Sequence, residues 1–361
     1  MREGWEYKKL GECTQILDSQ RKPVTKKDRK EGVYPYYGAT GIQDYVDKYI
    51  FDGRYVLVGE DGAKWGAFDK SAFIIDGKTW VNNHAHVLKP FEPLVDSYLT
   101  YYLNHSDLNG FISGAIVRKL TQSSLKNIKI PLPPKSTQLA IVSELDKINE
   151  LIRLKKEQLK DFDNLAQSLF YEMFGDPVEN EKGWEVKKLV EVSSLINGRA
   201  YKQNELLNEG KYKVLRVGNF FTNSNYYYSN LELDDEKYCY KGDLLFAWSA
   251  SFGAFIWDEG KTIFHYHIWR VLFDEKNLNI YYYKYLLNTM TNFFMNDVHG
   301  IGMVHLTKAG MEQYNLPLPP LPLQHLFAQR IEQIEHQKAE VQKAITDLET
   351  LLASRMQYWF E

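Results

Sequence analysis

The chain has 361 residues, which is enough for two or three domains that each bury a core of their own. Its 44% hydrophobic and 14% aromatic residues are incompatible with a disordered chain. The two cysteines, Cys13 and Cys239, make a disulfide framework or a cysteine-based zinc site implausible, and the net charge of −3 argues against a strongly basic nucleic-acid binder.

The charge is unevenly distributed along the chain. Residues 1–135 carry 20 Lys and Arg against 16 Asp and Glu, and residues 183–320 carry 14 against 15. The excess of acidic residues lies mainly in residues 136–182 and 321–361, so the charge permits DNA binding without requiring it. No run approaches the ~18 apolar residues of a membrane helix, and we expect a cytoplasmic protein.

The first part of the chain predicts a mixed α and β domain. It opens with Gly4-Trp5-Glu6-Tyr7-Lys8-Lys9-Leu10 and closes with Ile130-Pro131-Leu132-Pro133-Pro134. Between these motifs, apolar and β-branched runs predict strands, and a helical pattern follows them. The predicted strands are 55–58, 72–75 and 86–88, and the predicted helix is Asp96–Asn104.

The second part repeats the first about 180 residues later. Its opening motif is Gly183-Trp184-Glu185-Val186-Lys187-Lys188-Leu189, and its closing motif is Leu316-Pro317-Leu318-Pro319-Pro320. Further matches pair Tyr101–Asn104 with Tyr285–Asn288, Gly66-Ala67-Phe68 with Gly253-Ala254-Phe255, and Lys119-Leu120-Thr121 with His305-Leu306-Thr307. The period is too long for a solenoid, so it predicts a duplicated domain. The predicted strands are 213–217, 243–247 and 268–272, followed by a helix over Asn279–Asn296.

A long helix is predicted after each closing motif. Four residues beyond the last proline stand Gln138 and Gln324, and apolar residues then recur every three or four positions for about four to five heptads. Lys155, Lys338 and Arg355 are the polar residues of this seam. A helix of ~37 residues is ~55 Å long, which exceeds one small domain, so each helix should pair with the other.

The predicted fold class is α+β, with two mixed α/β domains separated by two long antiparallel coiled-coil helices in an internal pseudo-two-fold repeat. We place the first domain at residues 1–135, the first helix at 136–175, a linker at 176–182, the second domain at 183–320 and the second helix at 321–361.

No motif in the sequence predicts catalysis by this chain. His84-Ala85-His86 and His265-Tyr266-His267 would place two histidines on one strand face, but no third metal ligand follows at a suitable spacing. The glycine-containing turns lack a phosphate-binding pattern, and the double prolines do not form an amino-methyltransferase loop. Between the matched motifs the two copies differ greatly, as domains that recognise two different targets would.

The opening and closing motifs, the helix after each and the duplication of the whole resemble the specificity subunit of type I restriction–modification systems. The resemblance covers nearly the entire chain and extends to the junction from Phe170 to Pro177. It implies that each domain recognises one half of a split, asymmetric site in double-stranded DNA, while the helices fix the gap. It also implies docking of two methyltransferase subunits, with restriction subunits joining through the complex. S-adenosylmethionine, ATP and Mg would be cofactors of those partners, with none in this chain.

Polar and basic residues in the loops are the candidates for DNA contact, because Arg and Lys suit guanine edges or phosphates and Asn suits adenine. In the first domain they are Arg21, Lys22, Lys26, Lys64, Asn82, Asn83, Arg118 and Lys119. In the second domain they are Arg199, Lys202, Arg216, Asn219, Ser249, Ser251 and His299. Two alternatives stay open on the residues alone: a coiled-coil scaffold that binds protein rather than DNA, and a stand-alone enzyme.

Overall fold

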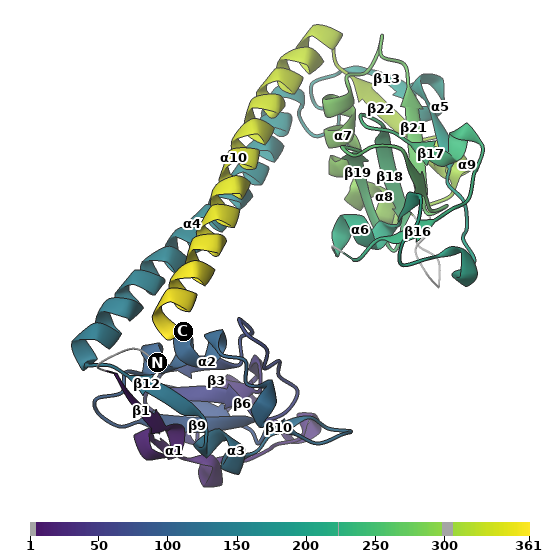
Figure 1. Cartoon of the computed structure of the whole chain (residues 1–361). Coiled ribbons are helices and arrows are strands. Elements are labelled where there is room, and N and C mark those ends of the chain that lie inside the picture. Colours follow the sequence, from purple (N-terminus) through teal and green to yellow (C-terminus); the bar gives the residue numbers. More distant parts are fainter. Residues whose placement is uncertain (1–4, 223, 298–305) are drawn as a thin grey trace. The chain divides into compact units, whose positions relative to one another are not determined.

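The computed structural model describes residues 5–222, 224–297 and 306–361. It divides into two compact units, one of Met1–Glu157 with Gln342–Glu361 (unit 1) and one of Gln158–Val341 (unit 2). Each unit contains one mixed α/β domain together with a segment of both long helices (Figure 1). We describe each unit by itself.

Unit 1 is built on two four-stranded sheets. One has the strand order β2-β9-β6-β7 and the other β4-β3-β8-β5, and only the β3–β8 pair of these two sheets is parallel. A two-stranded pair, β1–β12, joins the opening motif to the closing motif. The elements are β1 Glu6–Lys9, α1 Leu10–Cys13, β2 Thr14–Ile16, β3 Glu31–Gly38, β4 Gly41–Val46, β5 Phe51–Asp52, β6 Tyr55–Gly59, β7 Ala72–Ile75, β8 Lys78–Val81, β9 Ala85–Pro90, α2 Asp96–His105, β10 Ile112–Ser113, β11 Lys119–Leu120, α3 Gln122–Lys126, β12 Lys129–Leu132 and α4 Lys135–Phe174.

Unit 2 repeats the two four-stranded sheets and the β1–β12 pair strand for strand. Its sheets run β14-β21-β18-β19 and β16-β15-β20-β17, the β15–β20 pair is parallel, and β13 pairs with β22. The elements are β13 Glu185–Lys188, α5 Leu189–Val192, β14 Ser193–Asn197, β15 Tyr212–Leu215, α6 Val217–Phe221, β16 Tyr227–Ser229, β17 Tyr238–Cys239, β18 Leu244–Ser249, β19 Ser251–Ile256, β20 Thr262–Phe264, β21 Ile268–Phe273, α7 Ile280–Thr289, α8 Thr291–Asp297, α9 Lys308–Met311, β22 Asn315–Leu318 and α10 Leu321–Phe360. Helix α6, between β15 and β16, replaces the tight turn that joins β3 to β4.

The residues that match between the copies hold the frame of each domain. Tyr98 donates its hydroxyl hydrogen to Pro131 O (3.1 Å), and Tyr282 does the same to Pro317 O (2.7 Å). The side chain of Asn104 pairs with both backbone groups of Ala72, at 2.8 and 3.0 Å. These contacts tie the helix after the sheets to the closing motif and to a strand, which explains why they persist while the loops diverge.

The buried glutamines Gln138 and Gln324 explain the match that follows the prolines. Gln138 Oε1 accepts the Val95 N–H (2.9 Å) and its Nε2 donates to Pro133 O (2.9 Å). Gln324 makes the same bonds to Asn279 N (2.8 Å) and Pro319 O (2.8 Å). Because neither side chain is exposed, these amides satisfy backbone groups that water does not reach.

Three of the expectations from sequence are wrong. Strand β15 ends at Leu215, so Arg216 and Val217 begin α6 instead of continuing the strand as predicted. The region 279–296 forms two helices, α7 and α8. Asn288 clamps Ala254 at 2.7 and 3.1 Å as Asn104 clamps Ala72, so Ala254 corresponds to Ala72 and not to Ala67. The other predicted strands and the helix at 96 are confirmed within one or two residues.

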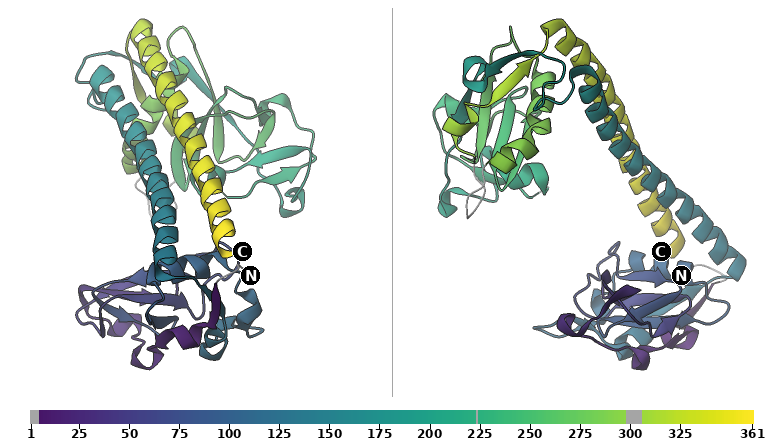
Figure 2. Two further views of the ribbon diagram at one scale, coloured as in Figure 1. Left: turned by 60° about the vertical axis from the view of Figure 1, so that its left-hand side comes forward. Right: turned by 180° about the vertical axis from the view of Figure 1, so that it is seen from behind.

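The two long helices run antiparallel inside each unit (Figure 2). In unit 1, Trp359 Nε1 donates to Glu144 Oε2 (3.0 Å) and Lys156 Nζ lies 2.7 Å from Glu349 Oε1. In unit 2, Lys338 Nζ lies 2.7 Å from Asp163 Oδ1, and further along α4 the ring of Phe170 packs 5.8 Å from that of Phe327. Rising numbers in α4 therefore meet falling numbers in α10, as predicted.

The heptad seam is buried, and two of its polar positions are paired. Leu145 and Ile345 in unit 1, and Ala166 and Ile331 in unit 2, have almost no exposed surface. The seam residue Lys338 meets Asp163, and the seam residue Arg355 binds Glu144 through both carboxylate oxygens. The polar interruptions thus become cross-helix ion pairs, which fix register at little gain in stability.

Candidate nucleic-acid interface

Arg21 and Lys119, both predicted as DNA contacts, lie in a charge network inside unit 1. Arg21 Nη1 lies 2.5 Å from Glu60 Oε2 and donates to Ala85 O (2.8 Å), and Lys119 Nζ lies 2.6 Å from Glu60 Oε1. Only 12% of the Arg21 side chain is exposed. Its guanidinium is thus engaged within the fold, and DNA contact by Arg21 stays a prediction.

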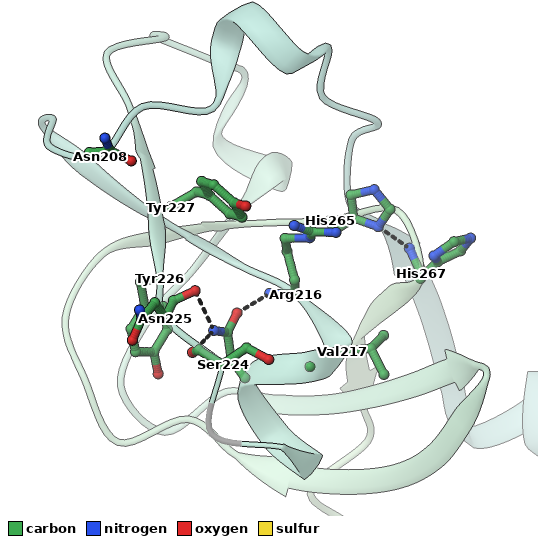
Figure 3. A pocket seen from close by; sticks show the side chains of 11 residues that line it. Asn208, Arg216, Val217, Ser224, Asn225, Tyr226, Tyr227, His265 and His267 are labelled. Carbon is green, nitrogen blue, oxygen red and sulfur yellow. Dashed lines mark hydrogen bonds between the residues drawn. The ribbon is translucent and has the colours of Figure 1, made fainter. Parts of the chain in front are cut away.

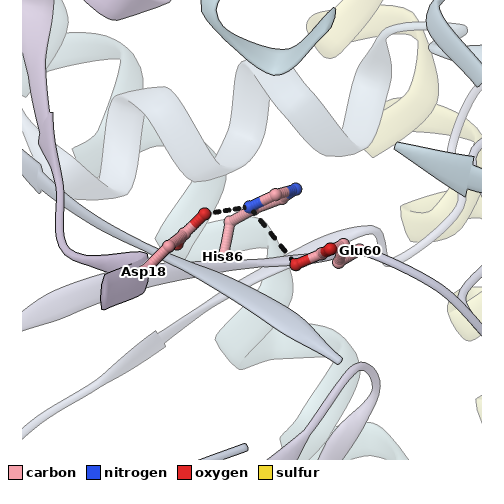
Figure 4. A group of neighbouring side chains, drawn as sticks. All are labelled: Asp18, Glu60 and His86. Atoms are coloured by element: carbon pink, nitrogen blue, oxygen red, sulfur yellow. Dashed lines mark hydrogen bonds and ion pairs between the residues drawn. The ribbon is translucent and has the colours of Figure 1, made fainter. Parts of the chain in front are cut away.

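His86 completes this network with Asp18 and Glu60 (Figure 4). Its Nδ1 lies 2.6 Å from Asp18 Oδ2 and its Nε2 lies 2.7 Å from Leu120 O. Both ring nitrogens therefore lie within hydrogen-bond distance of an oxygen atom. Burial alone would raise the pKa of the Asp18 and Glu60 carboxyls. Hydrogen bonds from His86 to Asp18, and from Lys119 and Arg21 to Glu60, instead lower both pKa values below their ordinary range.

Asp18, Glu60 and His86 could place ligand atoms close together, as a metal site would require. The two carboxylates are already paired with Arg21 and Lys119, so a metal ion would have to compete with these cations. The expected pair of histidines on one strand face is wrong. His84 precedes β9 and binds Asp61, whereas His86 lies within the strand.

The remaining candidates of unit 1 divide into buried and exposed residues. Asn82 is buried, donates from Nδ2 to Gln43 Oε1 (3.1 Å) and accepts the His84 N–H at Oδ1 (2.8 Å). Arg118 is exposed and donates to Asn109 Oδ1 (2.6 Å). The other four side chains are exposed in loops or in a short 3₁₀ turn, where they can meet a ligand: Lys22, Lys26, Lys64 and Asn83.

In unit 2, Arg199 is engaged within its own loop. Both its terminal nitrogens bind the Glu205 carboxylate, at 2.8 and 2.9 Å, and its guanidinium lies 5.2 Å from the centre of the Tyr201 ring. Arg199 lowers the pKa of Glu205 to about 2, mainly through these hydrogen bonds. Lys202 is exposed beside this pair, and its backbone N–H also binds Glu205 (2.8 Å).

The structure brings Arg216 and Asn219 together in one pocket of unit 2 (Figure 3). The pocket has a volume of ≈ 450 Å³ and contains no Asp or Glu in its lining, which is Asn208, Arg216, Val217, Gly218, Asn219, Ser224, Asn225, Tyr226, Tyr227, His265 and His267. Asn219 Oδ1 accepts the Arg216 N–H (2.7 Å), and its Nδ2 donates to Ser224 O (2.7 Å). Asn219 therefore shapes the loop, and the exposed Arg216 side chain is left to face a ligand.

His265 is held neutral in this pocket. Burial lowers the pKa of its imidazole to about 4, and the nearby His267 and Arg216 charges act in the same direction. The prediction that these two histidines share a strand face is wrong, because His267 lies in the turn before β21 and His265 forms an isolated bridge to Arg199. The one sequence signal for a pocket is the cluster of glycine and polar residues at 218–225, which follows the expected strand.

The candidates Ser249 and Ser251 are not part of this pocket lining. Ser249 and Ser251 face each other across the tight turn from β18 to β19, and Ser249 is buried. His299 lies outside the described residues. Among the described residues, no helix is long and apolar enough to cross a membrane.

Comparison with known proteins agrees with the duplicated architecture. The family model described as the type I restriction modification DNA specificity domain matches residues 2–161 and again residues 181–350. A putative type I restriction enzyme specificity subunit of Haemophilus influenzae is 30% identical over 91% of this chain and 87% of its own length. The specificity subunit of the MjaVIII enzyme of Methanocaldococcus jannaschii is 21% identical over 97% of this chain and 92% of its own.

Solved structures show the same fold. The type I restriction–modification S subunit of M. genitalium superposes with a TM-score of 0.59 at 13% identity, over 99% of this chain and 96% of that one. A chain from a study of complex assembly and conformational transition of the type I system gives 0.59 at 18% identity, over 100% and 98%. On its twofold match to the family model and its full-length relatives, the chain belongs to the family of type I restriction–modification DNA specificity subunits.

Proposed function

We propose that this chain selects a split, asymmetric DNA site, with unit 1 reading one half and unit 2 the other. One observation supports this proposal: the two domains share the same hydrogen-bonded framework, whereas their loops differ. The paired bonds of Gln138 and Gln324 are the same, whereas the loop from β3 to β4 is a tight turn and that from β15 to β16 holds α6. Equivalent frames with different loops are suited to reading different bases.

The family resemblance further supports a non-catalytic role within a larger assembly. In this proposal two methyltransferase subunits bind the chain, restriction subunits join through them, and the complex methylates adenine or cuts unmethylated DNA. S-adenosylmethionine, ATP and Mg are then bound by those partners. The length of the two helices sets the unspecified gap, so inserting whole helical turns changes the gap and leaves both half-sites as they were.

Two equivalent exposed leucines support the docking of two copies of one partner. Leu165 lies in α4 within unit 2, and Leu351 lies at the corresponding place of α10 within unit 1. They are 52% and 46% exposed on helices whose other face is buried in the seam. An exposed leucine repeated at matching positions is what two identical docking surfaces would present. Changing Leu165 to Glu should remove one methyltransferase subunit, and changing Leu351 as well should remove both.

The experiment that tests the function is to map adenine methylation in cells that express the chain with its cognate methyltransferase subunit. A bipartite motif is expected. Exchanging residues 1–135 for the first domain of another family member should change one half of that motif only. If the motif is continuous, or if the exchange changes both halves, the division of labour between the units is wrong.

A further inference from the structure

The end of the parallel strand pair is followed by different side chains in the two units. In unit 1 the parallel pair of β3 and β8 ends with Tyr37 beside Val81, and the Asn82 N–H binds Tyr37 O (3.0 Å). In unit 2, β15 and β20 end with Leu215 beside Phe264, and the His265 N–H binds Leu215 O (2.9 Å). Asn82 thus corresponds to His265. By the same register, Gly38 corresponds to Arg216.

In unit 1 this place holds two amides, and Gly38 stands where unit 2 has Arg216. Gln43, exposed on β4, accepts a hydrogen bond from the buried Asn82 (3.1 Å) and packs over Gly38, where an added Cβ would lie 2.1 Å from Gln43 Nε2. A larger residue than glycine would displace that amide. Glycine at this position therefore leaves the space that the Gln43 amide occupies.

In unit 2 the place holds an arginine that the fold does not neutralise. In the described part of the chain, no carboxylate lies within 4.0 Å of the Arg216 guanidinium. The guanidinium lies 5.3 Å from the centre of the Tyr227 ring, which restricts its orientation. Arg21, by contrast, meets both Asp18 and Glu60. Arg216 is therefore held in position with its donors still available to a ligand.

His265 adds a second donor beside Arg216. Its Nδ1 accepts the His267 backbone N–H (3.4 Å), so in the neutral ring the hydrogen is on Nε2, which can only donate (Figure 3). The ligand that suits two neighbouring donors in a pocket without carboxylates is one with two neighbouring acceptors. On the edge of a base pair in the major groove, guanine presents that pair in O6 and N7.

We propose that Arg216, steadied by Tyr227 and accompanied by His265, recognises a guanine in the half-site read by unit 2. This rests on the proposed function, since it names the base for one pocket of the DNA-reading chain. The corresponding place in unit 1, with Gln43 and Asn82, has no guanidinium and does not select guanine in this way.

The test compares R216K and R216Q with the unchanged chain, each expressed with the cognate methyltransferase subunit, by sequencing adenine methylation across the genome. Lysine keeps the charge but cannot form the two parallel bonds of arginine. We expect both variants to lose discrimination at one guanine of the second half-site by about 5- to 150-fold, the equivalent of about 1–3 kcal/mol. H265N, which introduces the residue of unit 1, should weaken discrimination at the same position. K241Q, at an exposed lysine that does not line the pocket, should leave the motif unchanged.

The first half-site is the internal control for folding and assembly. It should stay fully specified in every variant, because the Arg216 side chain takes no part in the Asn219 bond to its backbone. A near-normal R216K, with an R216Q that methylates all sites less but with the same base preference, would identify a phosphate contact and overturn the proposal. An unchanged motif in both variants would overturn it as well. If the unchanged chain itself yields no bipartite motif, the proposed function is wrong. That outcome differs from a bipartite motif that the Arg216 variants leave unchanged, which would contradict the guanine proposal alone.

Discussion

Replacing Gln138 by methionine tests whether the matched glutamines hold the frame. Gln138 has no exposed surface, and its amide satisfies Val95 N, Pro133 O and, at a longer 3.3 Å, Pro93 O. Methionine keeps the length and volume of the side chain, so little cavity forms and only the hydrogen bonds are lost. Two buried backbone groups left without partners cost about 1–3 kcal/mol each, and the more apolar side chain recovers about 1 kcal/mol, so the predicted loss is about 1–5 kcal/mol.

The loss should be confined to unit 1. Denaturant titration should show a lower free energy of unfolding, and hydrogen exchange should quicken around Val95 and α2 while unit 2 keeps its protection. Gln324→Met should produce the same loss in unit 2, and Gln342→Met, on the exposed surface of α10, should change stability by less than about 0.5 kcal/mol. A loss below about 1 kcal/mol for Gln138→Met, or equal loosening of both units, would refute the reasoning.

Three further predictions concern the charges and thiols. Lys338→Met should change the free energy of unfolding of unit 2 by no more than about 1 kcal/mol, because the pair with the largely exposed Asp163 gains little over an apolar seam residue; denaturant titration measures this. Folding lowers the pKa values of Asp18 and Glu60, so their contribution to the free energy of unfolding is complete above the ordinary carboxyl range and is lost as pH falls below about 4. Glu60→Gln should therefore reduce the fall in melting temperature at acid pH, which pH-dependent melting measures. Burial raises the pKa of Cys239 to about 12, so its thiol should react with a chromogenic disulfide only after unfolding.

The framework that the two domains share could be predicted from the sequence because its motifs occur twice. Two copies of the Gly-Trp opening, the proline closure and the heptads predicted two repeated α/β domains and two long helices without any knowledge of contacts. What the pattern did not give was the reason for each match. To predict that Gln138 bridges Val95 and Pro133, one would have to know that the start of α2 lies against the closing motif. That proximity arises only in the tertiary structure.

The tyrosine-rich strands and the loops were less predictable. Strand β3, Glu31–Gly38, contains Pro35 and three tyrosines and shows no apolar alternation, so its pattern did not indicate a strand. The region after Val214 reads as a continuing apolar run, yet the chain turns at Arg216 because Asn219 caps the backbone there. Local capping ends the strand despite the strand propensity of these residues, and the pocket forms where the chain turns away.

Residue type alone did not separate readers from structural residues, and the comparison of two arginines shows why. Arg21, after a short 3₁₀ turn, and Arg216, after β15, were both predicted to contact DNA. Arg21 has Asp18 and Glu60 within reach and is nearly buried, so binding DNA would require it to abandon two carboxylates that would then be buried without their partner. Among the described residues, no carboxylate is paired with Arg216, and its guanidinium lies over an aromatic ring in an open pocket. The energetic cost of releasing a side chain from the fold therefore decides which arginine can bind a ligand, and that cost depends on neighbours distant in sequence.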